Sequence, residues 1–137
     1  MKLKNSSLDQ VIRNPITVTE NMTFLEAREI LLKHRVGRLP VLDNNKKPVG
    51  IITEKDFVRA IYKTRPVTIE KILVKDFMSK KLITITKKGT VYDCANLMRN
   101  NRISSVLVLD NGNLSGIITK TDLASRSEEH TSELQSP

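Results

Sequence analysis

The sequence predicts an α/β (α+β) protein made of two copies of a β-α-β-β-α unit. The prediction rests on an internal repeat, on short β-branched runs that alternate with helical patterns, and on the composition. Hydrophobic residues make up 39% of the 137 residues, which is enough for one compact globular unit with a buried core. Aromatic residues make up only 4% and Trp is missing, so we expect an aliphatic core.

An internal repeat organises the chain. Residues 16–42 align without gaps on residues 83–109 at an offset of 67, and residues 48–57 align on residues 114–123 at an offset of 66. Each copy is too small to bury its own apolar face well, so we expect a pseudo-twofold pair with a shared core. The expected segments are a first repeat, a linker, a second repeat and a non-native tail, at residues 7–62, 63–74, 75–125 and 126–137.

Each copy begins with a short β-branched run, at 16–18 and 83–86, which predicts a strand. A helix then follows from Thr23 in the first copy, and a matching helix in the second, because apolar residues recur at helical spacing. The positions expected on the inward helix faces are Phe24, Ala27, Ile30, Leu31 and His34 in the first copy, and Val91, Cys94, Leu97 and Met98 in the second.

Two apolar runs separated by polar turn residues predict a hairpin in each copy. They lie at 39–42 and 49–52 in the first copy and at 106–109 and 114–118 in the second. The second turn contains Asn111-Gly112, which is the strongest short hairpin signal. A final helix is expected after Thr53 and after Thr119.

A lead-in precedes each copy. Residues 8–18 match residues 75–85 in type, and we expect a short helix in each. The first lead-in begins Ser7-x-x-Gln10, which has the form of a capping box. Residues 62–75 form a Lys-rich connector with its own apolar stretch at 69–74.

The charge and cysteine content narrow the class of protein. A net charge of +8 favours anionic partners, which include nucleic acid, acidic membrane surfaces and phosphorylated metabolites. The single cysteine, Cys94, excludes an internal disulfide and a Cys-rich zinc site. No apolar run approaches the ~20 residues of a membrane span, and the N-terminus lacks the apolar stretch of a secretory signal. We therefore expect a cytoplasmic protein with no membrane partner.

The last twelve residues, RSEEHTSELQSP, resemble the in-frame translation of a sequencing-library adaptor. The alternative is a natural polar C-terminus. In either case residues 126–137 are excluded from functional reasoning, and the natural protein is expected to continue past Ser125. Without this tail, which holds one Arg and three Glu, the net charge rises from +8 to +10.

The repeated GIIT-x-x-D element, the VGRLPVLD segment and the DFMSKKLITI lead-in together resemble a tandem pair of CBS domains, named after cystathionine β-synthase. The resemblance covers about residues 7–124. It implies two β-α-β-β-α repeats packed through their sheets as a pseudo-twofold module that often dimerises. It also implies a regulatory role in which an adenosine-containing ligand (AMP, ADP, ATP or S-adenosylmethionine) binds between the repeats.

Two Thr-x-x-Asp elements are the sharpest site candidates, at Thr53–Asp56 and Thr119–Asp122. Spacing alone favours helix capping, since Thr23-x-x-Glu26 and Thr90-x-x-Asp93 have the same form at helices where no ligand is expected. The resemblance instead implies that each Asp accepts hydrogen bonds from ribose hydroxyls while the Thr contacts sugar or phosphate. Capping and binding are compatible, because a helix N-terminus also favours an anion.

The resemblance implies two adenine-binding groups, each completed by a GIIT segment through Ile51 or Ile117. The group opposite Thr53 and Asp56 comprises Met78, Ile83, Ile103 and Ser104, and the group opposite Thr119 and Asp122 comprises Val11, Ile16, Val36 and Gly37. From sequence alone, core packing is the better explanation of the apolar members.

Arg38 is the expected phosphate ligand, since a guanidinium binds phosphate through two hydrogen bonds and relatives often carry His or Arg there. The alternative is a solvated surface arginine. Ser105 takes its place in the second repeat, so we expect the second cleft to favour a less charged adenosine ligand or to stay empty.

Catalysis is not predicted. His34 lies in a Lys/Arg-rich helix end, where it compensates the helix dipole, and Cys94 matches the inward position of Ala27. There is no Gly-rich phosphate loop and no His–carboxylate cluster outside the tail. We therefore expect no enzymatic activity, no catalytic cofactor and no metal.

The resulting hypothesis is an energy-sensing regulatory module that binds an adenosine nucleotide, forms a homodimer and passes its state to a regulated protein. One alternative is a ligand-free dimerisation or docking module. The other is a basic nucleic-acid-binding protein, which is disfavoured because the basic residues are spread over several turns without interleaved aromatics.

Overall fold

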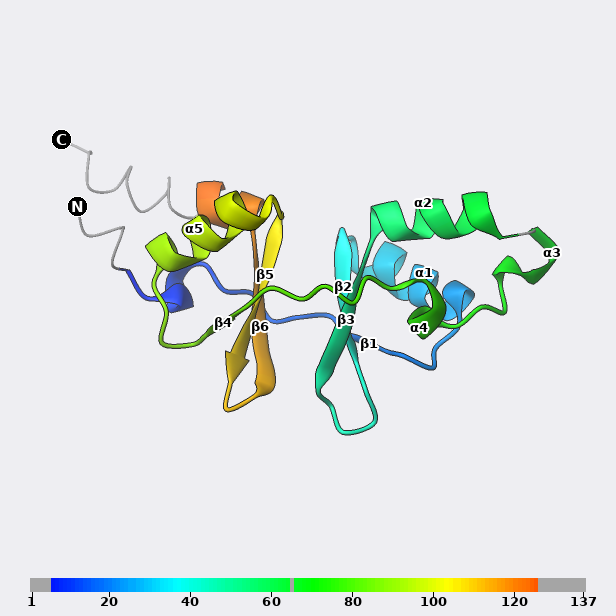
Figure 1. The fold of residues 1–137 in the computed structure, drawn as a ribbon, viewed down its shortest axis with the longest axis horizontal. Helices are drawn as coiled ribbons and strands as arrows, with labels where there is room; N and C mark the ends of the chain where they lie inside the picture. The colour runs from blue at the N-terminus through cyan, green and yellow to red at the C-terminus, as the bar shows by residue number, and fades with distance from the viewer. Residues whose placement is uncertain (1–5, 65, 126–137) are drawn as a thin grey trace. The chain divides into compact units, whose positions relative to one another are not determined.

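The computed structural model describes residues 6–64 and 66–125 and divides into two compact units (Figure 1). The N-terminal unit is formed by residues 15–82. Among the described residues, the C-terminal unit is formed by residues 6–14 together with residues 83–125. The lead-in of the first repeat therefore belongs to the unit that contains the second repeat. The adaptor-like tail at 126–137 lies outside the described residues.

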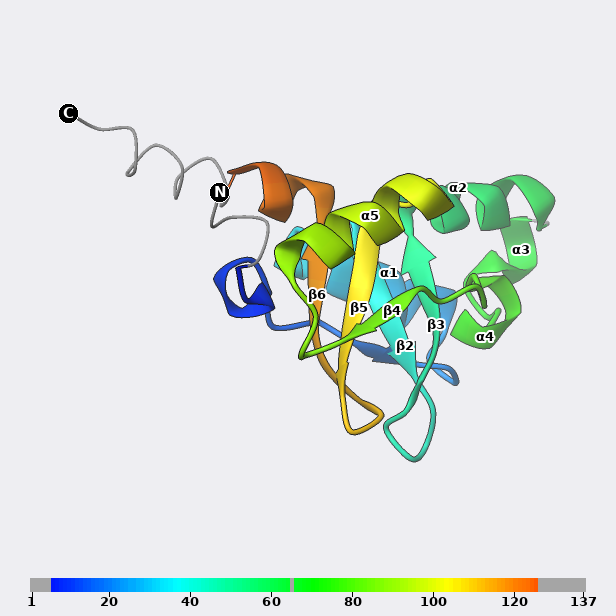
Figure 2. The ribbon, with the colours of Figure 1, turned by 60° about the vertical axis from the view of Figure 1, so that its left-hand side comes forward.

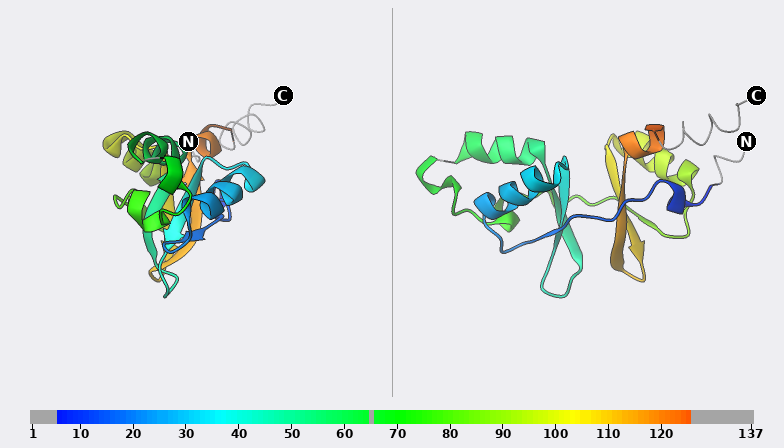
Figure 3. Two further views of the ribbon diagram at one scale, coloured as in Figure 1. Left: turned by 90° about the vertical axis from the view of Figure 1, so that its right-hand side faces the viewer. Right: turned by 180° about the vertical axis from the view of Figure 1, so that it is seen from behind.

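The N-terminal unit has the predicted β-α-β-β-α order. Its elements are β1 (Val18–Thr19), α1 (Phe24–His34), β2 (Arg38–Leu42), β3 (Pro48–Thr53) and α2 (Glu54–Lys63), followed by α3 (Pro66–Ile69) and α4 (Val74–Phe77). The sheet order is β1-β2-β3, with β1 parallel to β2 and β2 antiparallel to β3. Helices α1, α2 and α4 lie on one face of this sheet (Figure 3).

The C-terminal unit repeats this plan. Its elements are the 3-10 helix η2 (Leu8–Gln10), β4 (Thr84–Thr86), α5 (Val91–Asn101), β5 (Ser105–Asp110) and β6 (Asn113–Thr119). Residues 120–125 are helical. The sheet order β4-β5-β6 has the same parallel and antiparallel pairings. The predicted fold class, an α+β protein with two repeats, is confirmed.

The core of the N-terminal unit is partly aromatic, which corrects the expectation of an aliphatic core. All three Phe residues of the chain, Phe24, Phe57 and Phe77, meet there with ring centroids 5.3–5.4 Å apart. Edge-to-face packing of this kind adds stability beyond the area buried. Aliphatic residues from the strands, such as Leu39, Val41 and Ile52, pack in the same core.

The core of the C-terminal unit contains no aromatic side chain among its buried residues. Leu8 and Val11 of the lead-in pack there against Cys94 and Met98 of α5 and against strand residues that include Val106. The lead-in therefore supplies buried apolar area to a sheet that begins more than 60 residues later in the sequence.

The predicted caps begin both long helices. The Thr23 hydroxyl accepts from the Glu26 N–H at 3.2 Å, and the Thr90 hydroxyl accepts from the Asp93 N–H at 3.1 Å. The inward positions of α5 are as predicted, with Val91, Cys94 and Met98 buried. His34 differs from the prediction because it is exposed, and it is the last residue of α1, where a helix end leaves its side chain in solvent.

Candidate functional site

The candidate site in the N-terminal unit forms where β3 passes into α2. The Asp56 carboxylate Oδ2 accepts hydrogen bonds from the Thr53 N–H at 2.9 Å and the Thr53 hydroxyl at 3.2 Å. Arg38 lies directly across from Thr53 in the β2–β3 pairing. Arg38 is partly buried, and its Nε atom is shielded from solvent. Sequence-predicted Arg38, Thr53 and Asp56 are therefore neighbours within one unit.

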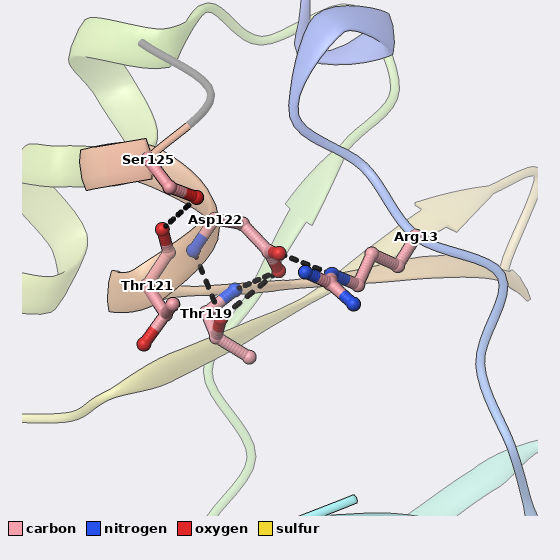
Figure 4. Close-up of polar contacts among 5 residues, drawn as sticks. All are labelled: Arg13, Thr119, Thr121, Asp122 and Ser125. Carbon is pink, nitrogen blue, oxygen red and sulfur yellow. Dashed lines mark hydrogen bonds and ion pairs between the residues drawn. The ribbon is translucent and has the colours of Figure 1, made fainter. Parts of the chain in front are cut away.

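The matching site in the C-terminal unit lies at the end of β6 (Figure 4). The Asp122 Oδ2 accepts from the Thr119 N–H and hydroxyl, both at 2.9 Å. The Thr119 hydroxyl also accepts from the Asp122 N–H at 3.1 Å, which completes a capping box. Ser105 lies across from Thr119, as Arg38 does from Thr53.

These two carboxylates differ from the carboxylates that cap the other helices. Asp56 is only 3% exposed and Asp122 is fully buried, whereas Glu26 and Asp93 are exposed. Capping uses only Oδ2 of Asp56 and of Asp122. The capping explanation is therefore correct for the Thr contacts, but it leaves the burial of the acids and the role of Oδ1 unexplained.

Two arginines contact Oδ1, and neither was predicted from the sequence to be a site residue. Arg59 Nη1 lies 3.1 Å from Asp56 Oδ1, and Arg13 Nε pairs with Asp122 Oδ1 (Figure 4). The first pair could have been found from its i,i+3 spacing on a helix. The second joins residues 109 positions apart, and no local pattern indicates it.

Each lead-in pairs with the last strand of its unit. The backbones of Ser79 and Ile51 exchange two hydrogen bonds of 2.9 Å, and those of Arg13 and Ile117 exchange bonds of 3.0 and 3.1 Å. In Figure 2 the blue N-terminal segment passes beside β6. A lead-in therefore lies along each GIIT segment, and in both units it is the lead-in of the other repeat.

Glycine permits this close approach. A Cβ on Gly50 would lie 2.9 Å from the Ser79 carbonyl oxygen, and a Cβ on Gly116 would lie 2.9 Å from the Arg13 carbonyl oxygen. Real Cβ atoms do not come this close to a backbone oxygen. The glycine of each GIIT element is thus explained by the crossing of the lead-in.

The contacts correct the register of the two lead-ins. The side chain beside Gly50 is Met78, and the side chain beside Gly116 is Ile12. Met78 therefore corresponds to Ile12 and not to Val11, with which the ungapped alignment paired it. Val11 is buried in the core of the C-terminal unit, so core packing accounts for this predicted site residue.

The remaining predicted residues line the ends of strands and helices. Those in the N-terminal unit (Ile16, Val36, Gly37 and Ile51) are partly buried, as are Ile83, Ile103 and Ser104 in the C-terminal unit, where Ile117 is buried. The Gly37 carbonyl accepts from the Glu54 N–H at 3.2 Å, and the Ser104 carbonyl accepts from the Lys120 N–H at 3.0 Å. Each predicted adenine group draws on both units, and its assembly stays a prediction.

Other kinds of site have little support in the described part of the chain. No three His, Cys, Asp or Glu side chains gather there as a metal-ligand group. Cys94 is buried as predicted, and burial raises the pKa of its thiol to about 11. Among the described helices, none has both the length and the apolar character needed to cross a membrane.

The family model of the CBS domain matches residues 8–63 and again residues 74–129. These two matches cover most of the chain. Each of them contains one β-α-β-β-α repeat and one Thr-x-x-Asp element. The chain therefore belongs to the CBS domain family and carries two CBS domains.

Similar proteins include enzymes and CBS domain structures. L-aspartate semialdehyde sulfurtransferase of Methanocaldococcus jannaschii is 35% identical over 117 residues, which are 85% of this chain and 22% of that protein. The CBS domain of a membrane protein from Sphaerobacter thermophilus is 27% identical, with a TM-score of 0.78 over 89% of this chain and 88% of that one.

The CBS domain pair of protein MJ0100 was solved in complex with 5′-methylthioadenosine and S-adenosyl-L-methionine. It is 30% identical to this chain, with a TM-score of 0.76 over 87% of this chain and 97% of the other. By contrast, the chain spans only between about a fifth and a third of the length of the curated relatives it first matches.

Proposed function

We propose that this chain is a regulatory, non-catalytic module that binds an adenosine-containing ligand: AMP, ADP, ATP or S-adenosylmethionine. In this proposal Asp56 and Asp122 accept hydrogen bonds from ribose hydroxyls, and Thr53 and Thr119 contact the sugar or a phosphate. Arg38 binds a phosphate. The apolar residues assigned above to each group contact the adenine, except Val11, which is buried in the core of the C-terminal unit.

The observation that carries the proposal is the burial of two carboxylates at matching positions. A buried carboxylate is unfavourable unless hydrogen bonds and opposite charges compensate it. Asp56 and Asp122 are nearly or fully buried, and each keeps one oxygen beyond what capping needs. A carboxylate oxygen has two acceptor positions, so Oδ1 can accept from a ribose hydroxyl as well as from an arginine.

The related CBS pair that was solved with two adenosine compounds supports the ligand class. A ligand that contacts both repeats would favour one of their arrangements over others, by a population shift. The surface offered to a regulated protein would change with it. We place this role in the cytoplasm, where a single free cysteine is stable.

Thermal unfolding of the full chain tests the proposal. AMP, ADP, ATP, S-adenosylmethionine and GTP are added separately at millimolar concentration. A ligand at ~100 times its Kd adds ~2.7 kcal/mol and raises the midpoint by several degrees. We expect a shift with at least one adenosine compound, none with GTP, and a smaller shift in Asp56→Ala.

Asp93→Ala is the matched control, since it removes a capping carboxylate that is exposed. Equal shifts in both variants would remove Asp56 from the site, and no shift with any compound would refute the function.

A second function is favoured by an apolar stripe on α2. Val58, Ile61 and Tyr62 follow the i, i+3, i+4 spacing of one helix face and are 66%, 58% and 90% exposed. Such a face suits assembly with a second copy of the chain, which matches the expected homodimer. Sedimentation of wild type and of Ile61→Glu tests it. Dimers lost in the variant, together with no response to any nucleotide, would favour a pure assembly module.

A further inference from the structure

An arginine and a serine occupy swapped positions in the two candidate sites. In the N-terminal unit, the residue across from the site threonine is Arg38, and the lead-in residue that pairs with Ile51 is Ser79. In the C-terminal unit, the residue across from Thr119 is Ser105, and the lead-in residue that pairs with Ile117 is Arg13. Each GIIT strand end therefore has one flanking arginine and one flanking serine, on opposite sides.

Arg13 is a partly exposed cation beside the buried carboxylate of Asp122. Its side chain is 53% exposed, while the carboxylate it contacts is fully buried. The contact to Asp122 uses Nε, and a guanidinium carries four further N–H donors on its two terminal nitrogens. The buried carboxylate thus fixes the direction of the guanidinium, and half of the side chain faces solvent.

The charged residues around Asp122, at the end of β6, favour the binding of an anion. The first helical residue after Thr119 is Lys120, whereas the first helical residue after Thr53 is Glu54. The Asp122 end therefore has Arg13 and Lys120 against a single carboxylate. Ser105 supplies no positive charge where the N-terminal unit has Arg38, but Arg13 of the lead-in supplies one from the other side of β6.

We propose that Arg13 is the residue that selects an anionic adenosine ligand at Asp122, by binding its phosphate with the terminal guanidinium nitrogens while Nε stays on the carboxylate. This inference rests on the proposed function and sharpens it. The second site prefers a phosphorylated ligand such as AMP over uncharged adenosine. The preference for a less charged ligand, inferred from Ser105 alone, is replaced by this proposal.

Isothermal titration with AMP and with adenosine tests the role of Arg13. The 137-residue chain carries Asp56→Ala, so that only the site at Asp122 binds, and it is compared with the same chain carrying Arg13→Gln as well. We expect AMP to bind about tenfold more tightly than adenosine before the second substitution, as for a partly exposed charge-assisted contact, and equally afterwards. Arg99→Gln is the control, since it removes the same charge from the same unit on α5, where it contacts Asn96.

A transplant provides a second measurement. In the same background, Arg13→Ser with Ser105→Arg gives the C-terminal unit the arrangement of the N-terminal unit, and we expect the preference for AMP to return. A merely structural Arg13 would lower both affinities together and leave their ratio unchanged, and an unchanged ratio overturns the inference. If wild type binds neither AMP nor adenosine, the proposed function fails and this inference fails with it.

Discussion

Gly50→Ala tests whether the close approach of the lead-in to β3 stabilises the N-terminal unit. The added Cβ would lie 2.9 Å from the Ser79 carbonyl oxygen and also meet the Met78 side chain. The backbone oxygen cannot move without breaking the two 2.9 Å hydrogen bonds between Ile51 and Ser79. Overpacking of this kind destabilises by about 1–3 kcal/mol.

Urea unfolding followed by circular dichroism measures the effect. With a slope of about 1–3 kcal/mol/M, we expect the midpoint of the transition to fall by about 1 M. Gly37→Ala is the matched control. Its Cβ would meet only the Glu54 Oε1 atom, at 3.3 Å, and that exposed side chain can move away. We expect a change within about 0.5 kcal/mol for the control. Equal midpoints for Gly50→Ala and wild type would refute the close crossing of the lead-in.

Three further predictions concern stability and reactivity. Because burial raises the pKa of Cys94 from 9.0 to about 11, the thiol stabilises the fold below pH 9, and this contribution is lost as the pH rises toward 11. Urea midpoints of wild type and Cys94→Ala across this range check it, and equal pH dependence would contradict it. Phe57→Ala removes one ring of the aromatic cluster and should destabilise by about 3–5 kcal/mol, whereas Leu32→Ala, at an exposed position of α1, should change stability by less than about 0.5 kcal/mol. Deleting residues 1–14 removes Leu8 from the core of the C-terminal unit, so hydrogen exchange should accelerate in β4–β6 and not in β1–β3; uniform acceleration would argue against two separate units.

The secondary structure could be predicted because its signals are local. Asn111 and Gly112 both have positive φ, at 53° and 80°, as the Asn-Gly turn requires. The N-caps at Thr23 and Thr90 follow from sequence spacing alone. Such signals depend on residues within a few positions of one another, so they can be identified without knowledge of the tertiary structure.

The register of the lead-ins could not be predicted, because it depends on contacts between distant segments. Ile12 and Val11 are both aliphatic, so residue type did not reveal which of them matches Met78. The decisive contact is steric, between the lead-in and Gly116. The role of Arg13 could not be predicted for the same reason, since its partner Asp122 is remote in sequence.

The most direct test of the central claim is the number of ligand molecules bound per chain. Isothermal titration uses the adenosine compound that gives the largest thermal shift, with wild type, Asp56→Ala, Asp122→Ala and the control Asp93→Ala. Losing the hydrogen bonds from a ribose diol to a carboxylate should weaken a site at least tenfold. We predict that each of the two buried-acid variants loses one binding event and that the control binds like wild type. Binding that is identical in all four proteins would contradict the assignment of Asp56 and Asp122 as ligand-binding residues.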